Sequence, residues 1–270
     1  MTDAPAALLP VALRAAEIAS ELVRTRVPGL LTAKGDRDMA SEVDYAVERA
    51  VRDHLKKRTP DIAILGEEEG ITGDTTGELL WAIDPVDGTA NFVRNIPLCG
   101  FSLGLIEKGR PVVGVIDLPF LGTRYHAAQH TGAYLGDRRI QASMTTDLKD
   151  AIVAIGDYAV GENAEAKNRR RIALTEHLAA NVQRVRMLGS AAIDLAWVAE
   201  GRLDASITLS NKPWDMAAGV IIAREAGAKV TDQDGSDHAS TSAATVATTP
   251  ALADDIRSLI STTSEAQSRS

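Results

Sequence analysis

The order of apolar and polar residues predicts two amphipathic helices at the start of the chain. Between Ala6 and Val27 the apolar residues recur every three or four positions, which is the period of one helix face, and a Pro-Gly pair ends the pattern. We expect a polar loop at residues 34–38. A second helix then begins at Ser41, which has capping-box spacing to Asp44, with Asp in the place of the usual Glu or Gln.

Short apolar runs that end in turn residues predict a mainly antiparallel sheet in the next part of the chain. The runs lie at residues 62–65, 79–83, 101–106 and 112–116, with shorter ones near Tyr125 and Tyr134. Residues 107–110 read Glu-Lys-Gly-Arg between two of these runs, which is typical of a hairpin connection.

Beyond residue 147 strands and helices alternate, which indicates an α/β unit. The expected strands lie at 152–155, 185–188 and 205–209 and near Lys229 and Val246, and the expected helices at 163–180, 191–200 and 216–226. Residues 261–270 are polar, and we expect them to be frayed. The pattern therefore predicts an α+β subdomain over residues 1–146, which carries the antiparallel sheet, and an α/β subdomain over residues 147–270.

Composition and charge exclude several classes of protein. The 270 residues carry 29 Lys and Arg against 37 Asp and Glu, a net charge of −8, which argues against a nucleic-acid binder that works through bulk positive charge. We expect a cytoplasmic protein with no membrane partner, since no stretch approaches ~18 consecutive apolar residues and the start of the chain lacks a secretory signal. The single Cys99 excludes an internal disulfide and a structural zinc site built on cysteines.

The excess negative charge is concentrated in one acidic segment. Residues 59–93 hold eight acidic residues and no Lys or Arg, so the rest of the chain carries 29 acidic and 29 basic residues. Within it, Asp84 and Asp87 follow an apolar run in the sequence Asp-Pro-Val-Asp-Gly-Thr. Two carboxylates at a strand end suit a hard divalent cation, and the amides of Gly88 and Thr89 are then free to face a phosphate. The alternative for each residue is a plain tight turn, because Asp, Pro and Gly are common turn formers.

Further carboxylates recur at comparable positions. Glu67 and its two neighbouring glutamates end the preceding apolar run, and their alternative is a solvated acidic loop. Asp215 lies at the start of a predicted helix, where it could equally be an N-cap. A single carboxylate at the end of a predicted element would indicate little. Plain turns explain poorly why carboxylates recur at the ends of several predicted elements.

Four motifs occur in a fixed order along residues 34–247. They are Gly66-Glu-Glu68, the run Asp84-Pro-Val-Asp-Gly-Thr-Ala-Asn-Phe92, Gly189-Ser-Ala-Ala192, and Trp214-Asp-Met-Ala-Ala-Gly219 followed by Glu225-Ala-Gly227. With these motifs the chain resembles the inositol monophosphatase family of Mg²⁺-dependent, lithium-sensitive phosphatases, which are related to fructose-1,6-bisphosphatase. The resemblance implies a layered αβαβα sandwich, a homodimer, and hydrolysis of a small phosphorylated substrate.

The resemblance also implies a ligand set for two or three Mg²⁺ ions. Glu67, Asp84 and the backbone carbonyl of Val86 would hold one ion, and Asp84, Asp87 and Asp215 a second, so that Asp84 bridges the two. A third, weaker ion would lie on the Glu67 side. Divalent cations would remove the repulsion among four clustered carboxylates and polarise the phosphoryl oxygens.

The same resemblance assigns the catalytic residues. Thr89 pairs with Asp44 of the second helix, and together with Glu67 they would orient and deprotonate the attacking water. Lys34 matches a basic residue near the metal site, with a solvated loop lysine as its alternative. Substrate contacts fall on Asp87, Gly88, Thr89, Gly189, Ser190, Ala191 and Thr208.

The sequence leaves the phosphate ester open. Thr208 lies seven positions before Asp215, where inositol-specific relatives have a Glu, so a charged acceptor for ring hydroxyls is missing. Myo-inositol 1-phosphate remains the first candidate substrate. Fructose 1,6-bisphosphate, histidinol phosphate and 3′-phosphoadenosine 5′-phosphate are rival substrates for the same chemistry. Lys212 is either an extra phosphate contact for a bisphosphate or a solvated loop lysine. The competing class is a regulatory binding protein that keeps the fold, which the presence of every metal ligand disfavours.

Overall fold

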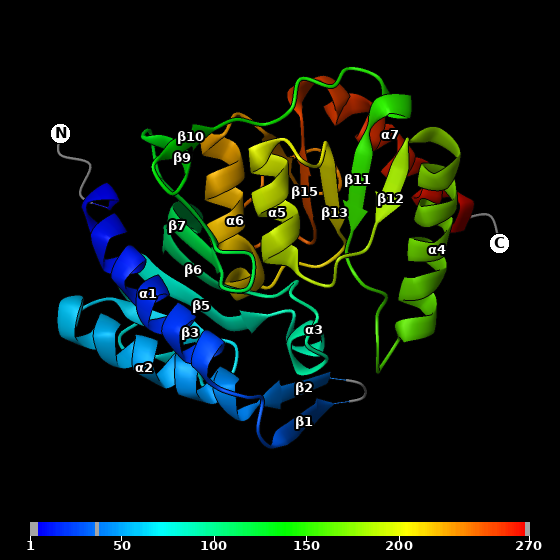
Figure 1. Ribbon diagram of the computed structural model, residues 1–270. Coiled ribbons are helices and arrows are strands. Elements are labelled where there is room, and N and C mark those ends of the chain that lie inside the picture. The colour runs from blue at the N-terminus through cyan, green and yellow to red at the C-terminus, as the bar shows by residue number, and fades with distance from the viewer. Residues whose placement is uncertain (1–4, 36–37, 268–270) are drawn as a thin grey trace.

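An eight-stranded sheet dominates the first half of the computed structural model, which describes residues 5–35 and 38–267 (Figure 1). Its strand order is β10-β9-β8-β7-β6-β5-β3-β4, and every neighbouring pair is antiparallel except β3 and β5. The strands are β3 (Ala63–Gly66), β4 (Gly70–Thr72), β5 (Leu79–Asp87), β6 (Gly100–Glu107), β7 (Arg110–Leu118), β8 (Thr123–Ala128), β9 (Gly132–Leu135) and β10 (Arg138–Ile140). The mainly antiparallel sheet is therefore confirmed.

The hairpin between β6 and β7 is also confirmed. Glu107 pairs with Arg110, and Lys108 and Gly109 both have positive φ, at 49° and 79°. Two consecutive residues of this kind match the right-handed twist of the flanking strands. The short strands β4 and β10 were not expected, because three residues give too little periodicity to detect.

Two helices cover one face of this sheet (Figure 1). Helix α1 (Leu9–Thr25) packs on β6 and β7, α2 (Glu42–Arg58) packs on β5, and the helices pack on each other. The capping box at the start of α2 is confirmed, since Ser41 accepts a hydrogen bond from the amide of Val43 and Asp44 accepts one from the amide of Ser41. Both helices bury their apolar faces in one core with the sheet.

The prediction of a polar loop at residues 34–38 is wrong for its described part. Strands β1 (Leu31–Gly35) and β2 (Asp38–Ser41) pair as an antiparallel hairpin, and residues 36 and 37 lie outside the described residues. Residues 31–34 of β1 are exposed, and the two strands have only five and four residues, so their pattern is too short to identify a hairpin from the sequence.

A second sheet of five strands forms in the other half, in the order β12-β11-β13-β15-β14. Its strands are β11 (Ile152–Ile155), β12 (Arg184–Arg186), β13 (Ala205–Thr208), β14 (Lys229–Thr231) and β15 (Thr245–Thr248), and its helices are α4 (Ala164–Asn181), α5 (Ala191–Glu200), α6 (Pro213–Glu225) and α7 (Ala253–Gln267). The three strands β12, β11 and β13 are parallel, as an α/β unit requires, while β15 runs antiparallel to β13 and β14.

The helices of the second half form two further layers. Helices α5 and α6 lie between the two sheets, and α4 and α7 cover the outer side of the five-stranded sheet (Figure 1). The order helix, sheet, helix, sheet, helix confirms the predicted αβαβα sandwich. The boundary between residues 146 and 147 stays a prediction, and one apolar core joins residues from both sides of it.

Helix α6 packs unusually close to the eight-stranded sheet. A Cβ atom on Gly104 of β6 would lie 2.5 Å from Cβ of Ala217, and one on Gly114 of β7 would lie 2.5 Å from the carbonyl oxygen of Ala218. These distances leave no room for any side chain at either glycine. The position of α6 on the sheet is therefore fixed by contact with backbone.

The expectation of a frayed end at residues 261–270 is wrong up to residue 267, because α7 continues to Gln267; residues 268–270 lie outside the described residues. Ile256 and Ile260 of α7, together with Leu252 just before it, pack in the core beside the second sheet. In the described part of the chain, no helix is both long and apolar enough to cross a membrane.

Candidate active site

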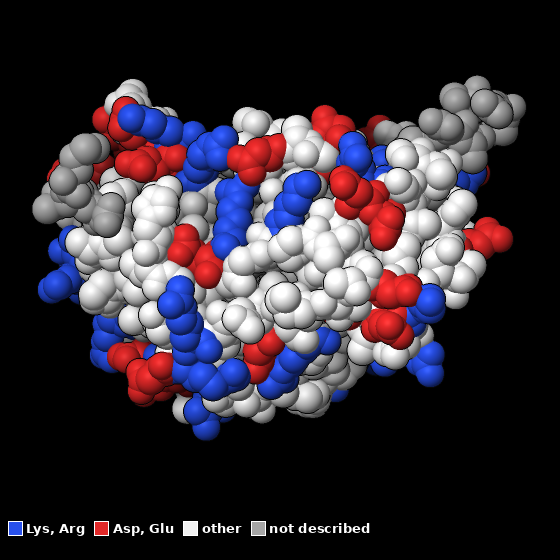
Figure 2. Space-filling view, turned by 90° about the horizontal axis from the view of Figure 1, so that it is seen from above, with Lys and Arg blue, Asp and Glu red and all other residues white. Residues whose placement is uncertain are grey.

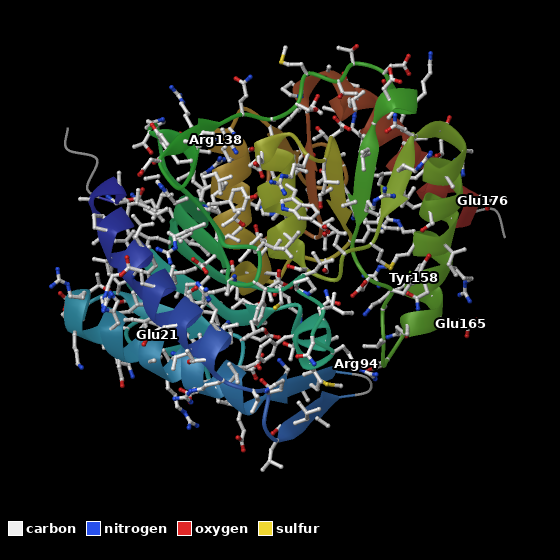
Figure 3. All side chains as sticks on the ribbon, in the orientation of Figure 1. Glu21, Arg94, Arg138, Tyr158, Glu165 and Glu176 are labelled. Carbon is white, nitrogen blue, oxygen red and sulfur yellow. The ribbon has the colours of Figure 1, made fainter. Side chains whose placement is uncertain are left out.

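One cavity of about 370 Å³ collects most of the predicted site residues. It lies where the end of β5 meets the starts of α5 and α6 and the segments that follow β11 and β13. Tyr158, labelled in Figure 3, lines it from the segment between β11 and α4. The predicted site residues that line it are Glu67, Asp84, Val86, Asp87, Gly88, Thr89, Gly189, Ser190, Ala191, Thr208 and Asp215.

The end of β5 presents both aspartates to the cavity. The pairing of β5 with β6 shifts in register between Asp84 and Asp87, and the backbone then turns at Gly88, which has a φ of 88°. A side chain is strained at this φ, so glycine suits the position. Asp84 accepts a hydrogen bond of 3.0 Å from the amide of Val86, and the short helix α3 (Thr89–Val93) begins directly after Gly88.

Asp87 ties the first sheet to the start of α5. Its Oδ2 accepts hydrogen bonds of 2.6 Å from the hydroxyl of Ser190 and 2.6 Å from the amide of Ala192. Ser190 is also the N-cap of α5, because its Oγ accepts a hydrogen bond from the amide of Ile193. The sequence motif predicted Ser190 as a substrate contact, but it carried no signal for this direct contact with Asp87.

The predicted pair of Thr89 and Asp44 is present. The Thr89 hydroxyl lies 3.0 Å from Oδ1 of Asp44 and 3.0 Å from the carbonyl oxygen of Val86, so the two acceptors compete for its single hydrogen. Burial raises the pKa of Asp44, and hydrogen bonds from Ser41 and Thr89 oppose the shift. Asp44 itself is buried beneath the cavity and reaches it through Thr89.

Glu67 is held by a cation from the β1–β2 hairpin. The ammonium of Lys34 lies 2.7 Å from Glu67 and 2.8 Å from Glu68. Burial opposes the charge of Lys34, but the two glutamates outweigh it and raise its pKa. Burial raises the pKa of Glu68 to about 7, although Lys34 opposes the shift. Lys34 is therefore in ion-pair contact with Glu67, one of the predicted metal ligands, and its role at the site stays a prediction.

The turn that carries Glu67 rests on a buried ion pair of α2 that the sequence did not reveal. Glu48 accepts hydrogen bonds of 2.8 Å from the amide of Glu68 and 3.0 Å from the amide of Glu69. Arg52 lies 2.7 Å from Glu48 and donates to the carbonyl oxygen of Gly70 on the far side of the turn. In the sequence the two look like an ordinary surface pair spaced by four residues.

Burial and mutual repulsion raise the pKa values of the clustered aspartates. Burial raises the pKa of Asp84 well above its usual range, and the charges of Glu67, Asp87 and Asp215 add to the shift. Burial raises the pKa of Asp87 to about 6, against the hydrogen bonds from Ser190 and Ala192. Burial and the charge of Asp87 raise the pKa of Asp215. Concentrated negative charge in a dry site is costly without a cation.

The donor set fits a hard divalent cation. Four carboxylates, a backbone carbonyl and a hydroxyl border one cavity, and oxygen ligands of this kind suit Mg²⁺. Among the described residues no Lys or Arg is paired with Asp84, Asp87 or Asp215. As the described side chains stand, no group of three or more His, Cys, Asp or Glu is arranged to hold a metal ion. Lys34 contacts Oε1 of Glu67, and the start of α5 donates to Oδ2 of Asp87, so each carboxylate keeps its other oxygen for a cation.

Comparison with known proteins places this chain among phosphoric monoester hydrolases. The chain belongs to the Inositol monophosphatase family, whose model matches residues 5–267. It is 36% identical over 214 residues to the fructose-1,6-bisphosphatase/inositol-1-monophosphatase of Thermotoga maritima, covering 78% of each chain. It is 37% identical over 204 residues to the Nus factor SuhB of Xylella fastidiosa, covering 76% of this chain and 72% of the relative.

A solved structure agrees with the fold. The inositol monophosphatase from Anabaena (Nostoc) sp. PCC 7120 has a TM-score of 0.84 and 33% sequence identity, covering 95% of this chain and 96% of its own. The present chain is thus a phosphatase of this family, as its motifs indicated.

Proposed function

We propose that this protein is a Mg²⁺-dependent phosphomonoesterase that hydrolyses small polyol phosphates. The observation that carries the proposal is the meeting of Glu67, Asp84, Asp87 and Asp215 around one cavity, where burial raises the pKa of all three aspartates. A buried set of carboxylates that lacks basic partners for its aspartates is suited to divalent cations.

The proposed metal ligands are those that the family resemblance implies. Glu67, Asp84 and the carbonyl of Val86 would hold one Mg²⁺, and Asp84, Asp87 and Asp215 a second, with a weaker third ion on the Glu67 side. When bound, Mg²⁺ would polarise the phosphoryl oxygens and lower the pKa of water. All of these residues line the cavity, which supports the assignment.

The residues of the chain supply the remaining chemistry. Glu67 and the Thr89 hydroxyl would orient the attacking water, and the 3.0 Å contact from Thr89 to Asp44 offers a route for its proton. The water would give its proton to Thr89 as Thr89 passes its own to Asp44, while the water oxygen bonds to phosphorus and the bond from phosphorus to the leaving oxygen breaks. A second water molecule would protonate the leaving alkoxide. The amides of Gly88 and Thr89 at the start of α3 would hold the phosphate oxygens.

The decisive experiment measures release of inorganic phosphate in the presence of Mg²⁺. Asp84→Asn should abolish it, whereas Asp74→Asn, which changes an exposed acid of the same acidic segment, should not. Full activity of Asp84→Asn would disprove the mechanism. Inhibition by millimolar Li⁺ is expected if the lithium sensitivity of the family holds here.

Myo-inositol 1-phosphate is the first substrate to test. Fructose 1,6-bisphosphate, histidinol phosphate and 3′-phosphoadenosine 5′-phosphate complete the panel, and kcat/KM for each ester decides among them. The Thermotoga relative named for both fructose bisphosphate and inositol phosphate supports including a bisphosphate.

A regulatory role alongside catalysis is the second candidate, because one relative is named a Nus factor. Retention of the four carboxylates favours the enzyme. On the face seen in Figure 2, Lys and Arg side chains are interspersed with Asp and Glu, and this pattern offers no broad basic surface for nucleic acid there. We place the protein in the cytoplasm because its one cysteine is buried and unpaired.

We also propose a homodimer. The exposed apolar side chains Ile96, Phe120, Leu121 and Met187 lie on loops that meet around Asn91, whose side chain donates to the carbonyl oxygens of Leu98 and Leu188. Phe120 also stacks on Phe92 beside these loops. A monomeric mass in light scattering would refute the dimer.

A further inference from the structure

Helix α6 carries Asp215 in its first turn, yet no side chain caps the start of this helix in the described structure. Lys212 is the N-cap residue, and its side chain makes no capping hydrogen bond. Helices α2 and α5, which also begin beside the site, are capped by Ser41 and Ser190. The position of the first turn of α6 therefore depends on contacts from other segments.

Ser102 of β6 makes one of these contacts, with the residue before Asp215. Its hydroxyl donates to the carbonyl oxygen of Trp214 at 3.3 Å, and the serine is 0% exposed. In the pairing of β5 with β6, Ser102 lies directly opposite Asp84. Residues opposite each other in an antiparallel pair point to the same face of the sheet. The hydroxyl therefore links the strand position of one proposed metal ligand to the helix turn of another.

Asn211 makes a second contact on the other side of the same turn. Its Nδ2 lies 3.1, 3.2 and 2.8 Å from the carbonyl oxygens of Ala239, Ser240 and Ser242, so its two hydrogens are shared among three acceptors. That loop is anchored in turn, because the amide of Ser240 donates to the carbonyl oxygen of Gly109 at 3.0 Å. Gly109 lies in the turn between β6 and β7, so both contacts connect the start of α6 to β6.

Asn211 is not the residue that stability alone would favour at this position. Its Oδ1 is buried and has no hydrogen-bond partner among the described residues. A buried acceptor without a partner costs free energy, whereas an apolar side chain of similar size would fill the position without this cost. The contact is therefore better explained by the placement of the turn than by a gain in stability.

We propose that Ser102 and Asn211 are positioning residues that hold Asp215 opposite Asp84, where the two carboxylates can share one divalent cation. The inference rests on the proposed function, because it takes Asp84 and Asp215 as ligands of the same ion. Neither Ser102 nor Asn211 lines the cavity, so both act through the backbone around Trp214 and not on the ion or the substrate.

Calorimetric titration with MgCl₂ separates an effect on one ion from a general loss of stability. Asp215→Asn is the reference, because it should remove the binding phase to which Asp215 contributes and leave binding on the Glu67 side. Ser102→Ala and Asn211→Leu should each weaken the phase that Asp215→Asn removes, by about 3- to 10-fold in Kd, since hydrogen bonds that place the turn are lost. The other phase should keep its wild-type Kd.

The rate of phosphate release gives a second readout. Both variants should need more Mg²⁺ for half-maximal activity and should regain a near wild-type kcat at saturating Mg²⁺. Ser206→Ala and Asn181→Ala are matched controls, because Ser206 is a 1% exposed serine on β13 and the Asn181 amide donates to the carbonyl oxygen of His177 at 2.7 Å. Neither control residue lines the cavity, so both should keep the wild-type Kd values.

Unchanged Kd values in Ser102→Ala and Asn211→Leu would overturn the positioning role, and so would equal weakening of both phases, which is the mark of a general structural effect. Asn211→Leu tests the second contact independently, so the proposal stays testable if Ser102→Ala does not fold. Absence of Mg²⁺ binding to the wild type would instead disprove the proposed metal sites, and the positioning role with them. Mg²⁺ binding without hydrolysis of any ester would disprove the phosphatase proposal, and the comparison of Kd values would still decide the positioning role.

Discussion

Glu48 and Arg52 form an ion pair of 2.7 Å on successive turns of α2, and both side chains are almost fully buried, at 0% and 2% exposure. The pair binds both ends of the turn between β3 and β4, through the amides of Glu68 and Glu69 and the carbonyl of Gly70. It therefore positions Glu67 without contacting the cavity.

Glu48→Ala should lower the free energy of unfolding by about 3–5 kcal/mol, because it leaves the Arg52 charge buried and unpaired. It should also raise the Mg²⁺ concentration for half-maximal activity, since the turn that presents Glu67 loses two acceptors. Urea denaturation and a Mg²⁺ titration measure the two effects. Asp53→Ala changes an exposed acid on the same helix and should alter stability by less than about 0.5 kcal/mol. Unchanged Mg²⁺ dependence in a folded Glu48→Gln protein would remove the positioning role.

Lys34→Met should lower the Mg²⁺ concentration for half-maximal activity about two- to fivefold. Lys34 occupies Glu67 at 2.7 Å, so its removal frees a proposed ligand from a partly exposed ion pair of modest strength. A Mg²⁺ titration of the initial rate measures the shift. Lys108→Met is the matched control, because Lys108 pairs with Glu78 at 3.0 Å outside the cavity. A higher Mg²⁺ requirement in Lys34→Met would show that the lysine assists binding.

Gly114→Ala should destabilise the fold by about 1–3 kcal/mol through overpacking, because the new methyl group would meet the carbonyl oxygen of Ala218 at 2.5 Å. It should also lower kcat, since the displaced helix α6 carries Asp215. Thermal unfolding and a rate measurement at saturating Mg²⁺ test both effects. Gly77→Ala meets nothing within 4 Å and should change neither. An unaltered kcat in Gly114→Ala would mean that α6 absorbs the methyl group without moving Asp215.

His238 should make stability depend on pH below neutrality. Burial lowers its pKa to about 4, and Arg224 adds to the shift. The unfolded chain binds the proton at a pKa near 6.5 and the folded chain near 4, so stability falls as pH drops through this range, by up to about 3 kcal/mol. Chemical denaturation between pH 7 and pH 4 measures the slope. His238→Gln should flatten it, while His177→Gln on α4 controls for loss of a histidine. An equal slope in wild type and His238→Gln would exclude this origin.

The sequence predicted most elements that follow a clear local rule. The capping box of Ser41 and Asp44 and the turn at Lys108 and Gly109 depend on neighbouring residues, and both are present. The β1–β2 hairpin was missed because its strands have only five and four residues, and residues 31–34 are exposed. Helix α7 was missed because its last turns are polar, although Ile256 and Ile260 bury one face.

The site was predictable only where a motif recorded it. The family motifs located Asp84, Asp87 and Asp215, and the fold brings them to one cavity. Glu48 belongs to no such motif, and its importance arises from burial against a turn that is distant in sequence. The acidic segment likewise looked uncompensated, yet Lys34 and Arg49 from outside it pair with its glutamates. Charge compensation of this kind depends on tertiary structure, which local spacing does not encode.

The contact of α6 with Gly104 and Gly114 has a consequence for sequence variation. Because Gly104 and Gly114 meet Ala217 and Ala218 there, small residues and backbone set how closely the helix that carries Asp215 approaches β6 and β7. Substitutions that resize other core side chains can then accumulate without changing the spacing of the ligands. In a redesign of this protein, the two glycines and the alanines opposite them are the positions to leave unaltered, and the remaining apolar core is open to repacking.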